Sequence, residues 1–278
     1  MNGNRVGATE SLLLALGYGV QASRQQLRES VVDLARIDAL GSHSAAAPDH
    51  SLGTSVHGVR LDPRVIVASG PEVVGRLERH REFYLKPRQC LLPAEGVIPY
   101  RFQLDPLSYR GQLGLLLEPT DRHTPAAAIL DRVRSVVLAA EVVSIARLEV
   151  GWEGTMWHVR YGEGAAFDGS CPIGPSMATV SGPEELDDLV LVDEWGTFAP
   201  DLGAVADFLA YVNRWLLLGP DVLVLAGAGH GPRLELQGLN PVAVFDDREP
   251  RVRRGEHVRV DGGPLGRIDA FVGAEGAA

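Results

Sequence analysis

The chain of 278 residues is poor in lysine, in cysteine and in positive charge. Its 36 aspartates and glutamates outnumber its 26 lysines and arginines, which gives a formal net charge of -10. Nucleic acids and anionic membrane surfaces attract basic patches, so we expect neither as the main partner. The sequence also lacks an apolar run as long as a transmembrane helix. These absences leave small molecules and other proteins as the expected partners.

Two cysteines, Cys90 and Cys171, lie far apart in the sequence. The simplest interpretation is two free thiols in a reducing compartment, and we therefore expect a cytoplasmic protein. The apolar run 11–20 resembles the start of a signal peptide, but Glu10 adjoins it and glycines interrupt it. A docked amphipathic helix is the better prediction for this run.

The amino-terminal part of the chain is predicted to differ from the rest. Residues 9–40 carry leucines and other apolar residues at spacings of three and four, which predicts helix. Residues 41–58 are rich in Ser, Ala, Pro and His and show no periodicity, which predicts a loop. The histidines of this loop are seven residues apart and match no compact metal motif. We therefore divide the chain into a helical segment with a flexible loop, 1–58, and one domain, 59–278.

From residue 59 onward most patterns indicate strands, and they do not alternate regularly with helices. This favours an α+β fold with a β-rich core. Expected strands are 65–68, 109–118, 189–193, 222–225, 257–260 and 267–272, and expected helices are 72–82, 125–142 and 202–218.

Several motifs in series resemble the fumarylacetoacetate hydrolase family. The order and spacing hold over about residues 59–273, with an apparent insertion at 240–254. The matching segments are Phe83-Tyr-Leu-Lys-Pro87, Phe167-Asp-Gly-Ser-Cys-Pro-Ile-Gly-Pro175 with Thr179 and Glu184-Glu185, Gly219-Pro-Asp-Val-Leu-Val-Leu-Ala-Gly227, Gly255-Glu-His-Val258 and Gly263-Pro-Leu-Gly266.

The resemblance implies a β-rich mixed roll of the hydrolase-domain type, a homodimer and a concave site at the mouth of the roll. Members of this family hold a divalent cation on a Glu-x-Glu pair and an Asp, because a hard cation prefers anionic oxygen ligands. A His–Glu pair activates water, which attacks a carbonyl group and leads to cleavage of a C–C bond.

The chain departs from the family at the positions that would bind the metal. The Glu-x-Glu pair falls on Arg110 and Gln112, and the Asp falls on Val143. A guanidinium at close range would repel a cation by several kcal/mol in a low-dielectric site. We therefore predict no metal site and no other cofactor.

Arg110 and Gln112 are two residues apart on an expected strand and so share one face. One hypothesis is that Arg110 takes the place of the metal and holds a carboxylate or enolate oxygen, while Gln112 adds a neutral donor and acceptor. The alternative is a solvated strand end or a structural salt bridge from Arg110 to Glu118 or Glu141. The sequence leaves both open.

Five further residues complete the predicted site. Arg147 matches the substrate-facing arginine of the family and is a candidate anion holder, with a structural ion pair as the alternative. His230 lies in a glycine-rich turn and is the candidate proton shuttle. Lys86 (the sole lysine), Tyr109 and His158 are candidate substrate contacts, although His158 also suits a packing role.

These features predict a metal-independent enzyme that acts on a small enolisable or 1,3-dicarbonyl acid by isomerisation, cyclisation or rearrangement. The arginine-rich composition, typical of GC-rich genomes, associates it with specialised, polyketide-like metabolism. Two alternatives remain. One is a C–C bond hydrolase, hydratase or decarboxylase of the parent type. The other is a non-catalytic ligand-binding or interaction protein on the same fold.

Overall fold

The computed structural model describes residues 54–56, 59–70, 72–74, 83–147, 149–153, 156–160, 162–227, 233–237, 240–244 and 251–273. The helical segment predicted for 9–40 and most of the predicted loop 41–58 lie outside these ranges. The end of that loop, Thr54–Val56, is strand β1, which pairs with β2, Val59–Leu61. Among the described residues, no helix is both long and apolar enough to cross a membrane.

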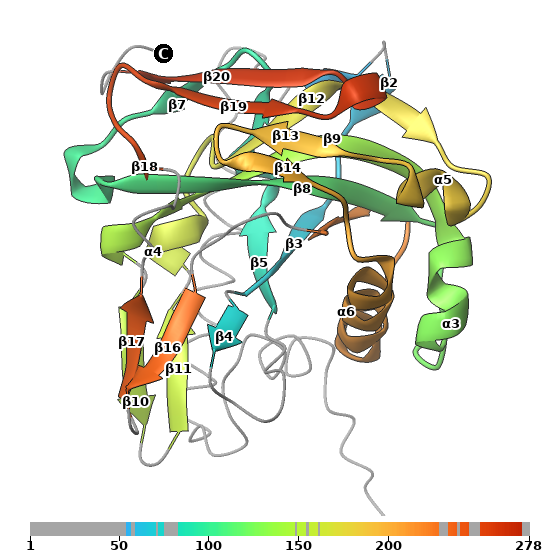
Figure 1. The fold of residues 1–278 in the computed structure, drawn as a ribbon. Helices are drawn as coiled ribbons and strands as arrows, with labels where there is room; N and C mark the ends of the chain where they lie inside the picture. The colour runs from blue at the N-terminus through green and yellow to red at the C-terminus, as the bar shows by residue number, and fades with distance from the viewer. Residues whose placement is uncertain are drawn as a thin grey trace, which may run out of the picture.

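The largest element is an eight-stranded mixed sheet, in which the long hairpin β8–β9 is central (Figure 1). Seven of its strands follow one another in the order β5, Phe83–Pro87; β3, Val65–Ser69; β15, Val222–Ala226; β8, Leu107–Leu117; β9, Val133–Ser144; β12, Cys171–Thr179; and β6, Leu91–Pro93. The short strand β18, Arg251–Val252, pairs with the start of β8.

This sheet is rolled so that its two ends meet. β5 is the first strand in the order and β6 the last, yet only the 3-10 helix η1, Arg88–Cys90, separates them in the chain. With neighbouring strands about 4.8 Å apart, a flat sheet of this order would place its edges tens of ångströms from each other. Three residues cannot span that distance, so the sheet curls and encloses one of its faces.

The enclosed face and the outer face carry different residues. Strand alternation places Ile66, Val137 and Leu223 on the inward face with the polar residues described below. Leu113 and Leu138 point outward into the main hydrophobic core. The predicted β-rich mixed roll is therefore confirmed in its strand content and in the scarcity of helices.

A second sheet of five strands covers the outer face (Figure 1). Its order is β14, Gly196–Phe198; β13, Leu191–Asp193; β19, His257–Asp261; β20, Arg267–Gly273; and β7, Val97–Pro99. At Gly111, a Cβ atom would lie 2.8 Å from a methyl group of Val260. The absence of a side chain on this glycine therefore lets the second sheet approach β8 closely.

Helices are few and mostly short. α6, Leu202–Trp215, begins at Asp201, whose carboxylate accepts a hydrogen bond from the Ala204 N–H at 3.0 Å. Its apolar side joins the outer core, as its hydrophobic periodicity predicted. The other short helices of the described residues are α3, Ala126–Ile129; α4, Gly162–Ala165; and α5, Glu184–Asp187. The 3-10 helices are η2, Phe102–Leu104; η3, Leu130–Arg132; η4, Ile145–Arg147; and η5, Gly263–Leu265. Two small sheets are also described: the pair β10, Glu149–Glu153, with β11, Met156–Arg160, and the group β4, Glu72–Val74, with β16, Arg233–Gln237, and β17, Asn240–Val244.

The predicted helix 125–142 is wrong. Only α3 and η3 are helical, and from Val133 onward the chain forms the twelve-residue strand β9. Valines recur through this segment, and β-branched side chains suit a strand that is buried on both faces. The predicted helix 72–82 also begins with a strand, β4, and residues 75–82 lie outside the described ranges.

Candidate functional site

Among the described side chains that point into the roll, four are buried and carry a charge or an amide group. Arg110 and Gln112 come from β8, Glu141 from β9 and Lys86 from β5. Arg110 lies directly opposite Glu141 in the β8–β9 register, and Gln112 lies opposite Ala139. We call these four residues the inward cluster.

The three positions that the sequence resemblance aligned with metal ligands share one face of the sheet. Val143 lies on β9 two residues after Glu141, and so it faces the same way as Glu141, Arg110 and Gln112. The sequence argument placed Arg110 and Gln112 on one face of a strand, and it made no such prediction for Val143. The structure adds Glu141 between them.

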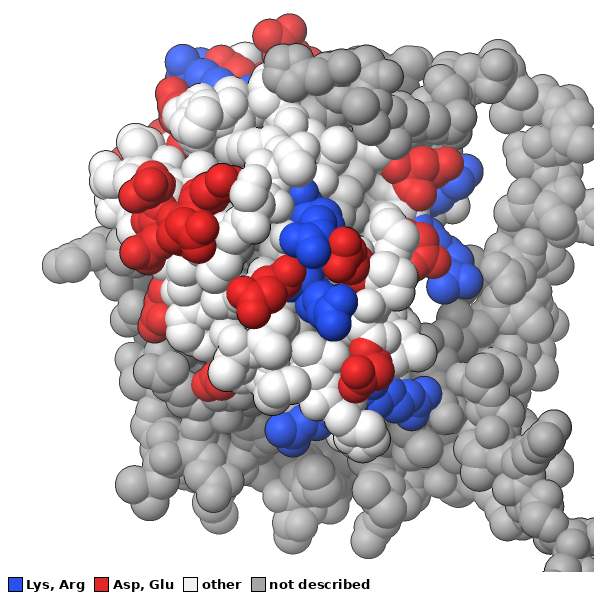
Figure 2. All heavy atoms as spheres, turned by 90° about the vertical axis from the view of Figure 1, so that its right-hand side faces the viewer, with Lys and Arg blue, Asp and Glu red and all other residues white. Residues whose placement is uncertain are grey.

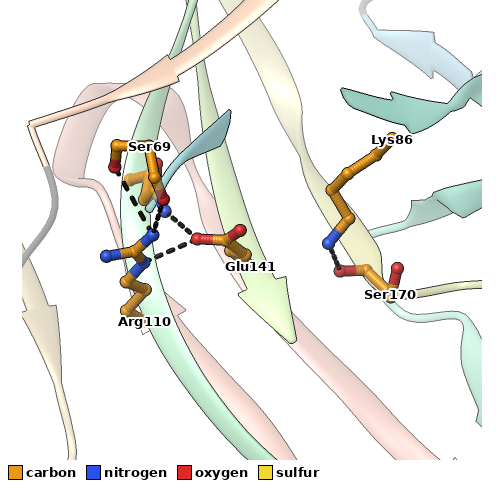
Figure 3. A network of polar contacts seen from close by, with 6 residues as sticks. Ser69, Lys86, Arg110, Glu141 and Ser170 are labelled. Atoms are coloured by element: carbon orange, nitrogen blue, oxygen red, sulfur yellow. Dashed lines mark hydrogen bonds and ion pairs between the residues drawn. The ribbon is translucent and has the colours of Figure 1, made fainter. Parts of the chain in front are cut away.

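Arg110 forms an ion pair with Glu141 inside the roll (Figure 3). Its Nε donates to Glu141 Oε2 at 2.5 Å, and its Nη2 donates to the Ser69 carbonyl oxygen at 2.5 Å. Gln112 Nε2 donates to the same Oε2 of Glu141. Glu141 and Gln112 are fully buried, and Arg110 is 8% exposed. Of the two alternatives for Arg110, the structural salt bridge to Glu141 is the one observed.

Glu141 is the acid of the inward cluster, and its pKa is shifted by burial. Complete burial raises its pKa well above the usual value, because the charged form loses its hydration. The two donors on Oε2 oppose this effect by stabilising the carboxylate. Within the described part of the chain, Glu141 Oε1 and Gln112 Oε1 have no hydrogen-bond partner. The cluster thus contains two buried oxygen acceptors that are free to meet a ligand or water.

Lys86 extends into the interior of the roll from strand β5 and is fully buried. Its Nζ donates to the Ser170 carbonyl oxygen at 2.9 Å, which joins β5 to the residue that precedes β12 (Figure 3). The same carbonyl accepts the Val142 N–H at 2.9 Å. Burial lowers the pKa of the Lys86 ammonium, and the nearby Arg110 charge lowers it further. The fully buried amine therefore holds its proton less tightly than an exposed lysine does.

Both thiols lie near this amine, and they form no disulfide with each other. Cys90 and Cys171 are free and buried, as the sequence predicted. Burial raises the pKa of both, to about 12 for Cys171, while the Lys86 charge opposes the shift. Neither thiol is a thiolate near neutral pH, so neither is a candidate nucleophile.

Tyr109 and Arg147 lie apart from the inward cluster. Tyr109 pairs with Val142 in the register, points to the outer face of the sheet and donates to the Arg259 carbonyl oxygen at 3.3 Å. Its predicted contact with substrate beside Arg110 does not fit this placement, because adjacent residues of a strand face opposite ways. Arg147, in η4, donates from Nε to the Gln103 carbonyl oxygen at 2.9 Å.

Two predicted histidines are not tested. His230 lies outside the described residues. His158 lies in β11, opposite Gly151 of β10, and its side chain is outside the description. Their roles as proton shuttle and substrate contact stay predictions.

Glu141 was missed as a site residue, although its sequence context gave a signal. It is the single charge in an apolar stretch from Val136 to Val143. A charge in such a stretch is buried only when it is paired. The wrong helix prediction for 125–142 hid the strand partner, because it removed the hairpin that sets Glu141 opposite Arg110.

Comparison with solved structures identifies the fold. A fumarylpyruvate hydrolase from Pseudomonas aeruginosa in complex with Mn²⁺ and pyruvate superimposes with a TM-score of 0.59 at 16% identity, over 84% of this chain and 100% of that one. The chain shares the fold of this enzyme.

Two isomerases have the same fold. 5-Carboxymethyl-2-hydroxymuconate delta-isomerase from Mycobacterium smegmatis gives a TM-score of 0.57 at 15% identity, over 76% of this chain and 77% of that one. 2-Hydroxyhepta-2,4-diene-1,7-dioate isomerase from Mycobacterium marinum gives 0.55 at 18%, over 79% and 80%. No protein-family model and no curated protein sequence matches the chain. At these identities the likeness establishes the fold, and the chemistry has to be argued from the site.

The residues of the inward cluster do not fit a divalent cation. Arg110, Gln112 and Val143 carry a guanidinium, an amide and an isopropyl group, and none of these is an anionic oxygen ligand. The one carboxylate present, Glu141, already accepts two hydrogen bonds on Oε2. Among the described residues, no group of three or more His, Cys, Asp or Glu side chains is placed to hold a metal ion.

We predict that Mn²⁺ and Mg²⁺ leave the melting temperature of the protein unchanged. A ligand that binds only the folded state raises the melting temperature by mass action, so a missing site gives no shift. Differential scanning fluorimetry with each cation, against a chelator, measures this. A triple variant Arg110→Glu, Gln112→Glu and Val143→Asp restores the carboxylates and is expected to gain a shift with Mn²⁺. A saturable shift in the wild-type protein would contradict the prediction.

Proposed function

We propose that the protein is a metal-independent enzyme that isomerises a small enolisable acid by proton transfer inside the mouth of the roll. The observation that carries this proposal is the inward cluster, in which a buried carboxyl of raised pKa stands where a metal site would otherwise be. Cyclisation or rearrangement of the same enolate needs the same groups and belongs to the same proposal.

Glu141 is the group that moves the proton. A carboxylate whose pKa is raised is a stronger base, and it takes a proton from the carbon next to the substrate carbonyl more readily. The same carboxyl then returns that proton to a second carbon, which leaves the overall composition unchanged. Proton removal leaves an enolate, whose oxygen carries no hydrogen, so Gln112 Oε1 is an acceptor for a hydroxyl hydrogen only when the substrate binds as its enol.

Arg110 is a positioning residue in this scheme. Its Nε and the Gln112 amide hold Glu141 by the same oxygen, which leaves Oε1 for the substrate. Arg110 is also the cluster residue with solvent exposure, next to Ser69 at the end of β3. Substrate therefore has to approach from the Ser69 end. We retain Arg147 and His230 as further candidate substrate contacts.

The names of the fold neighbours support the proposed substrate class. Two neighbours are named as isomerases of unsaturated hydroxy acids, and a third is in complex with pyruvate. Substrates of this kind carry an acidic C–H next to a carbonyl, which a single carboxylate can remove. The homodimer, the cytoplasmic location and the link to specialised metabolism stay predictions.

Solvent deuterium exchange tests the proposal directly. We predict that the wild-type protein, in D₂O with a chelator, exchanges the α-hydrogens of at least one acid from a panel of pyruvate, oxaloacetate and 2,4-dioxo acids, as followed by proton NMR. Glu141→Gln is expected to slow the exchange by about 100-fold or more, the usual contribution of a general base.

Glu118→Gln is the matched control, because Glu118 is partly exposed at the end of β8 and pairs with Arg134 on the surface. It should exchange at the wild-type rate. Gln112→Met removes the Gln112 Oε1 acceptor and leaves the ion pair between Arg110 and Glu141 in place. Slower exchange by a folded Gln112→Met variant therefore reports a loss of chemistry and not a loss of folding. Unchanged exchange in folded Glu141→Gln would overturn the assignment of Glu141.

A non-catalytic role is the second candidate. The contacts of the inward cluster favour this non-catalytic role. Arg110 already donates to Glu141 and Ser69, and the other three residues of the cluster are fully buried. In that case no acid of the panel would exchange above the buffer rate, and Arg110 variants would change stability alone.

A further inference from the structure

A cavity of about 590 Å³ lies between one side of α6 and the turn that precedes α3. None of its lining residues belongs to the inward cluster. The side chains with polar groups that line it are Arg122, His123, Thr124, Asp207, Tyr211 and Arg214. Its volume is in the range of small-molecule sites in proteins.

The turn on one side of the cavity is anchored to α6 by a fully buried amide. Asn213 Nδ2 donates to the Asp121 carbonyl oxygen, and Asn213 Oδ1 accepts from the Thr120 hydroxyl at 2.5 Å. The Leu218 N–H donates to the same Oδ1 at 3.3 Å. Because the buried amide uses both of its ends, the turn has a fixed position against α6.

The turn is also ordered by its own hydrogen bonds. The Asp121 carboxylate accepts the His123 N–H at 2.8 Å, and the Thr124 N–H donates to the Asp121 carbonyl oxygen at 3.1 Å. Arg122 and His123 are therefore carried by a rigid turn, opposite Arg214 on the last turn of α6. The fixed backbone of the turn reduces the conformational entropy that is lost when an anion binds there, although the two arginine side chains are exposed.

The lining of the cavity carries more positive than negative side chains, in contrast to the chain as a whole. Two arginines face one aspartate, whereas the chain as a whole carries a formal net charge of -10. In the part of the chain that the structure describes, no carboxylate forms an ion pair with Arg122 or Arg214. Figure 2 shows the face that carries α3 and α5, where one group of acidic side chains lies at the side and further acidic side chains lie among the basic ones. The positive lining is therefore a local feature.

We propose that this cavity is a second ligand site, which binds a small anion through its phosphate or carboxylate groups. The two guanidinium groups offer planar, paired donors to such oxygens. The His123 ring and the Thr124 hydroxyl add further hydrogen-bonding groups to the cavity wall. This site is independent of the proposed proton transfer in the inward cluster.

Isothermal titration calorimetry of the full chain with inorganic phosphate and, separately, with citrate tests the proposal. Binding in the millimolar range or tighter is expected for at least one of the two anions. The double variant Arg122→Ala and Arg214→Ala should bind it about tenfold more weakly or worse, because two charged hydrogen-bond donors are lost. The stronger of the two anions identifies phosphate or carboxylate as the recognised group.

Arg254→Ala is the matched control, since Arg254 is an exposed arginine in another turn. It should bind like the wild type. Glu141→Gln should also bind like the wild type, which separates this site from the inward cluster. Absence of binding by the wild-type protein, or equal binding by a folded double variant, would overturn the proposal.

Discussion

Replacing Glu141 by leucine is expected to lower the free energy of unfolding by about 3–5 kcal/mol. Glu141 is fully buried, and its carboxylate is the ionic partner of Arg110 at 2.5 Å. Without Glu141, the buried guanidinium loses this ion pair. The cost comes from the loss of the pair in the interior and from the Gln112 amide, which also loses its acceptor.

The double variant Arg110→Met and Glu141→Leu should recover most of this loss. Buried ion pairs are often replaced by apolar residues of similar volume at little cost, because desolvation offsets much of the Coulomb attraction. Urea denaturation of both variants, followed by circular dichroism, gives the coupling energy of the pair. Glu118→Leu serves as the surface comparison, since its partners Arg132 and Arg134 are exposed, and it should change stability by at most about 1 kcal/mol.

The outcome also bears on function. If the double variant is stable but no longer exchanges deuterium, the pair is retained for chemistry and the fold does not require it. If the double variant is less stable than Glu141→Leu alone, Arg110 contributes through contacts other than the ion pair, and its role as a positioning residue for Glu141 would have to be abandoned.

The sequence predicted the part of the site that depends on period-two alternation. Arg110 and Gln112 share a face because a strand repeats every two residues, and the strand at 109–118 was recognised from its composition. The hairpin at 257–272 and helix α6 were also predicted, since glycines and a clear helical period mark them. These are local signals, and each is complete within one element.

What the sequence could not supply is the pairing between elements. The Val-rich segment 133–144 has apolar residues on both faces, so its periodicity does not distinguish a buried strand from a helix. The register that sets Arg110 opposite Glu141 follows only once that segment is a strand. The contact between Lys86 and Ser170 depends on the curl of the whole sheet, which no single segment encodes.

Lys86→Met is expected to raise the free energy of unfolding by about 1–3 kcal/mol near neutral pH, the cost of burying a poorly compensated polar group. The methionine keeps the length of the apolar stem and removes the amine. The Ser170 carbonyl oxygen keeps its hydrogen bond from the Val142 N–H, so no buried acceptor is left without a donor.

The pH dependence of this gain has a definite sign. Burial lowers the pKa of Lys86 in the folded protein below its usual value of 10.5. Between the lowered pKa and 10.5, the unfolded chain holds a proton that the folded protein has released, so stability rises with pH across that window. The advantage of Lys86→Met over the wild type should therefore shrink as the pH rises towards 10.5.

Urea denaturation of both proteins from about pH 7 to about pH 10 measures this difference. Lys86→Met should also keep the deuterium exchange of the wild type, because the amine contacts a backbone carbonyl and not the free oxygens of Glu141 and Gln112. A variant that is less stable than the wild type at every pH would mean that the amine has a stabilising role. Loss of exchange in a stable variant would support the prediction from the sequence that Lys86 contacts the substrate.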